Sequence, residues 1–158
     1  MNLSQKIVAA VDSSRSDAPY EISAEHDGAS VTLAIRTADG VGIAFDSLVF
    51  RCDRYRDADS RTLAAWGDRI KSKVTYLLEP LAVIEVDTLG GEVELRSQPP
   101  TTRDGRRGYY EIRLDRAGSL KLCRFAFDDT AKSRVQVPCN LTREVVERLI
   151  DDLVATSN

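Results

Sequence analysis

The stretch SRTLAAWGDRIKSKVTYLL, residues 60–78, constrains the fold most, because its apolar residues recur at three- and four-residue steps. This spacing predicts an amphipathic α-helix from Ser60 to Leu78, capped by Asp59 or Ser60 and ended by Pro80. The predicted buried stripe consists of Leu63, Trp66, Gly67, Ile70, Val74 and Leu77. The rest of the chain must therefore supply an apolar surface that covers this stripe.

Gly67 is unusual within that stripe, because glycine inside a helix costs about 1 kcal/mol relative to alanine. The favoured interpretation is that a neighbouring strand or backbone comes so close to Gly67 that no side chain fits. A hinge or a ligand slot is the alternative.

Turn residues predict the register of four hairpins. Asp27-Gly28 pairs Ala24 with Val31, Ile22 with Leu33 and Tyr20 with Ile35. A loop at residues 38–40, with Gly40 left-handed, pairs Ile35 with Ile43 and Leu33 with Phe45, and a bulge follows near Asp46-Ser47. A loop at residues 88–91 pairs Val86 with Val93 and Ile84 with Leu95. Arg116-Ala117-Gly118 pairs Leu114 with Leu120 and Ile112 with Leu122.

These elements predict an α+β fold in which an antiparallel meander sheet, curved or split in two, packs against two amphipathic helices. The second of these helices runs from Leu141 to Val154 with Asn140 as its cap, and a short N-terminal helix spans Asn2 to Val11 with Ser4 as its cap. We expect a single domain over residues 1–158. Its halves, about 20–78 and 81–154, follow one plan and suggest a pseudo-repeat.

Composition narrows the classes of function. A net charge of −3 argues against a nucleic-acid binder, and no apolar run is long enough to span a membrane. Without a secretion signal, a cytoplasmic protein is expected. Cys52, Cys123 and Cys139 lack CxxC spacing and suggest small buried thiols, while His26 suits an exposed strand end. No motif predicts a cofactor.

Four carboxylates form the first candidate site. The predicted register places Glu85 opposite Glu94 and Asp87 opposite Glu92 on one face of a hairpin. Such a cluster could bind a metal cation or a basic partner, or share a proton in acid-base chemistry. The favoured alternative is a solvated face relieved by nearby arginines such as Arg113.

An arginine-rich loop beside two tyrosines forms the second candidate, a protein-interaction surface. Its residues are Arg103, Arg106, Arg107, Tyr109 and Tyr110. Tyrosine and arginine are favoured in interface hot spots. Because adjacent strand residues point to opposite sides, one of the two tyrosines must face away from the core.

The order helix, three strands, helix, strands, helix resembles that of the small dimeric chaperones that escort type III secretion effectors. That resemblance implies a homodimer and an effector-binding role. From the residues themselves we expect a non-catalytic protein-interaction or adaptor module, since no catalytic motif is present. The alternatives are the dimeric escort and a small cation-dependent hydrolase that uses the acidic hairpin face.

Overall fold

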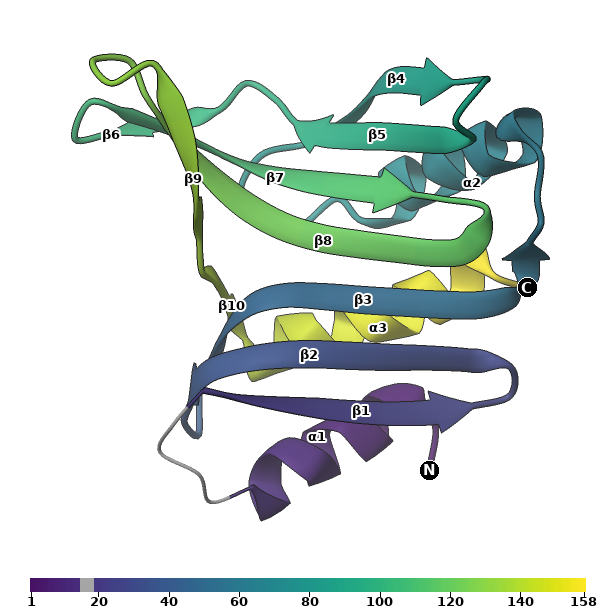
Figure 1. The fold of residues 1–158 in the computed structure, drawn as a ribbon. Coiled ribbons are helices and arrows are strands. Elements are labelled where there is room, and N and C mark those ends of the chain that lie inside the picture. The colour runs from purple at the N-terminus through teal and green to yellow at the C-terminus, as the bar shows by residue number, and fades with distance from the viewer. Residues whose placement is uncertain (15–18) are drawn as a thin grey trace.

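In a computed structural model that describes residues 1–14 and 19–158, the chain forms three helices and one antiparallel sheet of ten strands that does not close into a barrel (Figure 1). The helices are α1 (Leu3–Ser13), α2 (Ser60–Lys73) and α3 (Arg143–Thr156). The strands are β1 (Tyr20–His26), β2 (Ala29–Ala38), β3 (Gly42–Arg56), β4 (Leu81–Asp87), β5 (Glu92–Ser97), β6 (Thr101–Arg103), β7 (Arg106–Leu114), β8 (Ala117–Asp128), β9 (Ser133–Val137) and β10 (Cys139–Thr142). The predicted α+β class is confirmed.

The main strand order is β1-β2-β3-β8-β7-β5-β4, and β10, β6 and β9 pair with β3, β7 and β8 respectively. All three helices lie on one face, which we call the inner face, and the helix-free side is the outer face (Figure 1). Helix α2 follows β3 but packs against β4 and β5, whereas α3 packs against β3. Helix α2 follows the first half of the sheet and covers the second half, whereas α3 follows the second half and covers the first.

The predicted stripe of the central helix is buried along its whole length, from Leu63 to Leu77. The predicted end at Leu78 is wrong, because the helix ends at Lys73 and Val74 leaves helical geometry. The consecutive β-branched residues Val74 and Thr75 disfavour a further turn. Val74 and Leu77 stay buried in the connection that follows.

Gly67 faces side chains rather than a close backbone. A Cβ added at Gly67 would lie 3.4–3.6 Å from Val93, Leu95 and Leu114 side chains, which is ordinary van der Waals contact. The predicted lack of room for a side chain is therefore wrong.

Gly67→Ala is accordingly expected to raise the free energy of unfolding by about 0.5–1 kcal/mol, because alanine favours the helix and its methyl group fits. Urea unfolding of the variant beside the parent protein measures this change. A loss of stability of similar size would mean that Val93 and its neighbours cannot accept the methyl group.

The first and last hairpins have the predicted registers, and Asp27, Gly28 and Gly118 have positive φ as their turns require. Val86 pairs with Val93 as predicted, but a bulge at Ile84 makes Val83 the partner of Leu95, so the Ile84 pairing is wrong.

Two bulges rather than one shape the β2–β3 hairpin. Asp46 is the extra residue in β3, as predicted, and Arg36 is a second extra residue in β2. Ala38 pairs with Ile43, so the turn is longer than the predicted loop at residues 38–40, and Ile35 pairs with Phe45 instead of Ile43. Arg36 Nε donates to Asp46 Oδ1 at 2.6 Å, which joins the two bulges. Gly40 does not have the predicted positive φ.

Two predicted helix starts shift. Thr142 caps α3 by accepting from the Val145 N–H, because Asn140 and Leu141 belong to β10, where they pair with β3. Asn2, not Ser4, caps α1 in a reciprocal arrangement with Gln5. Among the described residues, no helix combines the length and apolar character needed to cross a membrane.

Candidate functional site: the two faces of strand β7

The five residues of the predicted interaction surface gather at the β6–β7 end of the sheet but divide between its two faces. Tyr109 and Arg107 point outward, whereas Tyr110 and Arg106 point inward, because side chains alternate along β7. Arg103 lies opposite Arg106 in β6 and shares the inner side. The sequence thus predicted one surface where the structure has two.

Neither tyrosine is freely exposed, although Tyr109 does face away from the core. Tyr109 is 8% exposed because the Arg96 guanidinium lies 4.7 Å from its ring centroid. Tyr110 is 4% exposed, and Arg124 lies 4.4 Å from its ring centroid. Burial raises the pKa of Tyr110 to about 12, so its hydroxyl stays protonated at neutral pH.

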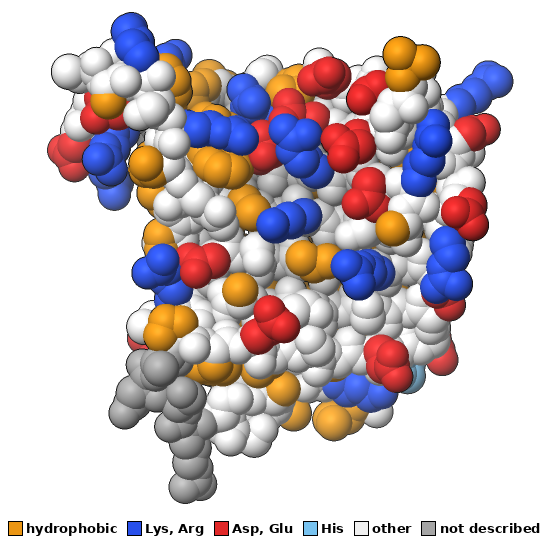
Figure 2. Space-filling view, viewed as in Figure 1, with side chains coloured by type: hydrophobic (Ala, Val, Ile, Leu, Met, Phe, Trp, Pro, Cys, Tyr) orange, Lys and Arg blue, Asp and Glu red, His pale blue; other side chains and the backbone are white. Residues whose placement is uncertain are grey.

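A row of aromatic rings covered by arginines occupies the outer face. The guanidinium-to-centroid distances are 3.8 Å for Arg134 on Phe125, 4.7 Å for Arg96 on Tyr109 and 5.0 Å for Arg107 on Phe127. Tyr109 and Phe125 also contact each other, with centroids 6.1 Å apart. We call these six residues the arginine–aromatic row. Figure 2 shows basic and acidic side chains interleaved over this part of the sheet.

An open pocket of about 730 Å³ adjoins the arginine–aromatic row where β5 runs into β6. Tyr109, Phe127 and the consecutive prolines Pro99 and Pro100 supply apolar surface, and Arg96 and Arg107 supply positive charge. Among the described residues, no Asp or Glu lines this outer pocket. It can therefore accept an apolar group that stands beside a negative charge.

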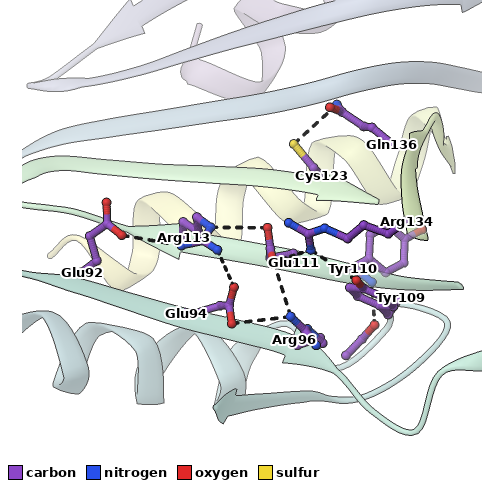
Figure 3. Close-up of polar contacts among 11 residues, drawn as sticks. Glu92, Glu94, Arg96, Tyr109, Tyr110, Glu111, Arg113, Cys123, Arg134 and Gln136 are labelled. Carbon is purple, nitrogen blue, oxygen red and sulfur yellow. Dashed lines mark hydrogen bonds and ion pairs between the residues drawn. The ribbon is translucent and has the colours of Figure 1, made fainter. Parts of the chain in front are cut away.

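Next to the row, two nearly buried carboxylates are held by arginines (Figure 3). The side chain of Glu94 is 10% exposed and that of Glu111 is 6% exposed. Arg113 donates to Glu94 at 2.8 Å and Arg134 to Glu111 at 3.0 Å. Arg96 lies within 3.7 Å of both carboxylates.

The two neighbouring carboxylates influence each other's ionisation, and their pKa values move apart. Burial, followed by the neighbouring Glu111, raises the pKa of Glu94. Burial opposes ionisation of Glu111 as well, but the interactions with Glu94 and Arg134 outweigh it and lower its pKa. Glu94 is therefore the group of the pair that holds a proton more readily.

The carboxylates of the predicted metal site stand in the predicted register, with Glu85 opposite Glu94 and Asp87 opposite Glu92. Arg113 engages both Glu94 and, at 3.6 Å, Glu92. Asp87 Oδ1 accepts two N–H groups of its own turn. In the described part of the chain, no group of three or more His, Cys, Asp or Glu is arranged to hold a metal ion.

Mg²⁺ or Ca²⁺ is therefore expected to leave the melting temperature unchanged at constant ionic strength, because arginine or backbone N–H groups already engage Asp87, Glu92 and Glu94. Differential scanning fluorimetry with and without each cation measures this. A cation-dependent rise that disappears in Glu85→Gln and Glu94→Gln variants would instead support the metal site.

A buried ion pair on the inner face was not among the predicted sites. Glu79, 3% exposed, accepts from both terminal nitrogens of Arg124 at 3.1 Å, from Ser97 Oγ at 2.7 Å and from Thr101 Oγ1 at 2.5 Å. Burial would raise the pKa of Glu79, but these donors outweigh it and lower that pKa. One sequence pattern could have indicated this pair: Arg124 and Ser97 lie at strand positions whose side chains point inward, in line with the buried apolar residues of β8 and β5.

The three cysteines are buried free thiols, as predicted, and burial raises the pKa of each, that of Cys139 to about 12. His26 lies at the end of β1, with Nε2 3.2 Å from Asp27 Oδ2. No known protein family, curated protein or solved structure matches this chain.

Proposed function

We propose that this protein is a non-catalytic interaction module that binds a segment of a partner protein at the outer pocket. The observation that carries the proposal is the arginine–aromatic row beside a pocket with apolar walls and two arginines. Aromatic residues and arginine are enriched in the binding hot spots of protein interfaces.

The chemistry of the outer pocket favours a partner segment that places an apolar side chain beside a carboxylate. Each guanidinium carries five N–H donors, and Arg107 uses one of its own on Asp129 at 2.8 Å. That pair is exposed and easily exchanged for a partner carboxylate, since exposed ion pairs contribute little. Pro99, Pro100 and Phe127 would bury the apolar side chain.

The other reactive groups support binding rather than catalysis. Buried thiols with raised pKa values are poor nucleophiles. The carboxylates Glu79, Glu94 and Glu111 are each engaged by arginine, which leaves them poorly placed to exchange protons with a substrate.

The test is fluorescence polarisation with labelled acidic peptides that also contain leucine or phenylalanine. We expect saturable binding that weakens with added salt and falls roughly fivefold in Arg107→Ala. Arg51→Ala is the matched control, because Arg51 is exposed on the outer face of β3, away from the pocket. Equal binding by Arg107→Ala, or no difference between acidic peptides and their amidated counterparts, would overturn the proposal.

The homodimer and the cytoplasmic location stay predictions. Light scattering on a size-exclusion column tests the first, and a stable dimer would favour the escort alternative.

A further inference from the structure

We propose that a second cavity, on the inner face of the β6–β7 end, binds a small aliphatic carboxylate. This cavity of about 860 Å³ lies between the sheet and the start of α3, on the opposite side of β7 from the outer pocket. Pockets of this size hold small organic ligands.

The cavity follows from the sequence of the two strands that form its floor. Beyond Tyr110 and Arg124, the next inward positions are Gly108 and Ala126, which pair with each other across β7 and β8. A Cβ added at Gly108 would come within 2.8 Å of Arg124 Nη2, so the glycine leaves room for the guanidinium. The β6–β7 and β8–β9 ends also reach past the helices (Figure 1). Small side chains without a covering helix leave a hollow.

Part of the wall of this inner cavity is apolar, beside polar residues such as Thr101, Asn140 and Thr142. Leu78, from the connection between α2 and β4, lines it while 70% exposed. Leu141 and Val145 line it from β10 and the first turn of α3, and Val137 from β9. An aliphatic chain in the cavity would cover Leu78 and remove this apolar surface from water.

Two arginines at the rim offer N–H donors to an anion. Arg103 and Arg106 line the cavity, and neither forms an ion pair within 4.0 Å in the described part of the chain. Arg124 is already paired with Glu79. Asp104 also lines the cavity and offsets one of the two positive charges, so the rim attracts an anion chiefly through the unpaired guanidinium groups.

Asp128, which pairs with Arg106 across the strands, stays charged and attracts the Arg106 guanidinium, but the two side chains form no ion pair within 4.0 Å in the described part of the chain. Its carboxylate accepts the backbone N–H groups of Thr130 at 2.8 Å and Ala131 at 3.2 Å. The charge and the walls together fit a ligand with one carboxylate at the rim and an aliphatic chain along Leu78 and Leu141. A purely polar anion would leave the apolar part of the wall exposed to water, and a neutral lipid would leave the arginines without an anionic partner.

Isothermal titration calorimetry with decanoate tests the site, with decanol and acetate as the neutral and short-chain controls. We expect saturable binding of decanoate alone, weakened roughly fivefold in Arg106→Ala and unchanged in Arg107→Ala, its neighbour on the other face. Ala126→Leu, which fills the floor, is expected to abolish binding. Circular dichroism checks that each variant is folded.

Failure of decanoate to bind in the millimolar range would overturn the inference, as would equal binding of decanol or undiminished binding by folded Ala126→Leu. Sensitivity to Arg107→Ala instead of Arg106→Ala would also overturn it. Because the peptide assay depends on Arg107 and the decanoate assay on Arg106, either proposal can fail while the other stands.

Discussion

Trp66→Ala is expected to lower the free energy of unfolding by about 3–5 kcal/mol, the cost of removing a large aromatic side chain from a packed core. Trp66 is fully buried in α2 and stacks on Tyr55 of β3 with ring centroids 4.2 Å apart. Its Nε1–H donates to Thr156 Oγ1 in α3 at 3.0 Å. One side chain therefore joins two helices to strand β3 of the sheet.

Urea unfolding followed by circular dichroism measures the change, and Trp66→Phe is the matched variant. Phenylalanine retains much of the ring but lacks the N–H, so Trp66→Phe should lose less than Trp66→Ala. Thr156→Val removes the acceptor for the indole N–H together with the bond that Thr156 Oγ1 donates to the Leu153 carbonyl. It is expected to cost about 1–3 kcal/mol, chiefly because the indole N–H is then buried without its partner. A loss below about 1 kcal/mol for Trp66→Ala would contradict the packing described here.

Arg124→Met is the second change with a large expected effect, again about 3–5 kcal/mol of unfolding free energy near neutral pH. Methionine approximates the length of the side chain but leaves the Glu79 carboxylate buried without its charged donor. Glu79→Gln combined with Arg124→Met should recover most of the loss, because the neutral amide can accept from Ser97 with its oxygen and donate to the Thr101 hydroxyl with its NH2 group.

The pH dependence of this pair has a definite sign. In the parent protein the pKa of Glu79 is lower in the folded state than in the unfolded state. The ionised carboxylate therefore stabilises the fold fully above the unfolded-state pKa, and this stabilisation is lost as the pH falls through the folded-state pKa. In Arg124→Met, burial prevails and raises that pKa, so the variant regains stability on acidification. The difference between parent and variant should therefore shrink from neutral pH towards pH about 4.

Arg36→Met provides the control for Arg124→Met, because Arg36 pairs with Asp46 while its side chain is 54% exposed. A change below about 1 kcal/mol is expected there. Unfolding curves of both variants at several pH values compare the two ion pairs. Equal losses in Arg36→Met and Arg124→Met, or a difference from the parent that grows on acidification, would contradict the role given to Glu79.

Local turn chemistry explains why much of the fold could be predicted. Asp27-Gly28 and Arg116-Ala117-Gly118 fix their hairpins within a few residues, and the registers that follow are confirmed. The bulges at Arg36 and Ile84 could not be predicted in this way, because each depends on pairing across strands rather than on the residues of the turn. Asn140 resembles a helix cap until β10 pairs with β3.

The candidate site could be predicted from the sequence only in part. Alternation along β7 predicted that Tyr109 and Tyr110 would point to opposite faces, but not that Arg96 and Arg124 would cover them. Likewise Glu79 and Arg124 are 45 residues apart, and only the folded sheet brings them together. From the sequence alone, an arginine at an inward-pointing strand position looks like an interruption of the apolar core rather than one half of a buried ion pair.

The most direct test of the central claim, that the outer pocket is the partner-binding site, is an amide chemical-shift titration with an acidic peptide containing leucine or phenylalanine. We expect the largest shifts to cluster at the pocket residues Arg96, Arg107, Tyr109 and Phe127. Amides on the helix side of the inner cavity, such as those of Leu141 and Val145, and amides on β1 should move little. Shifts centred on another surface, or none at saturating peptide, would contradict the claim.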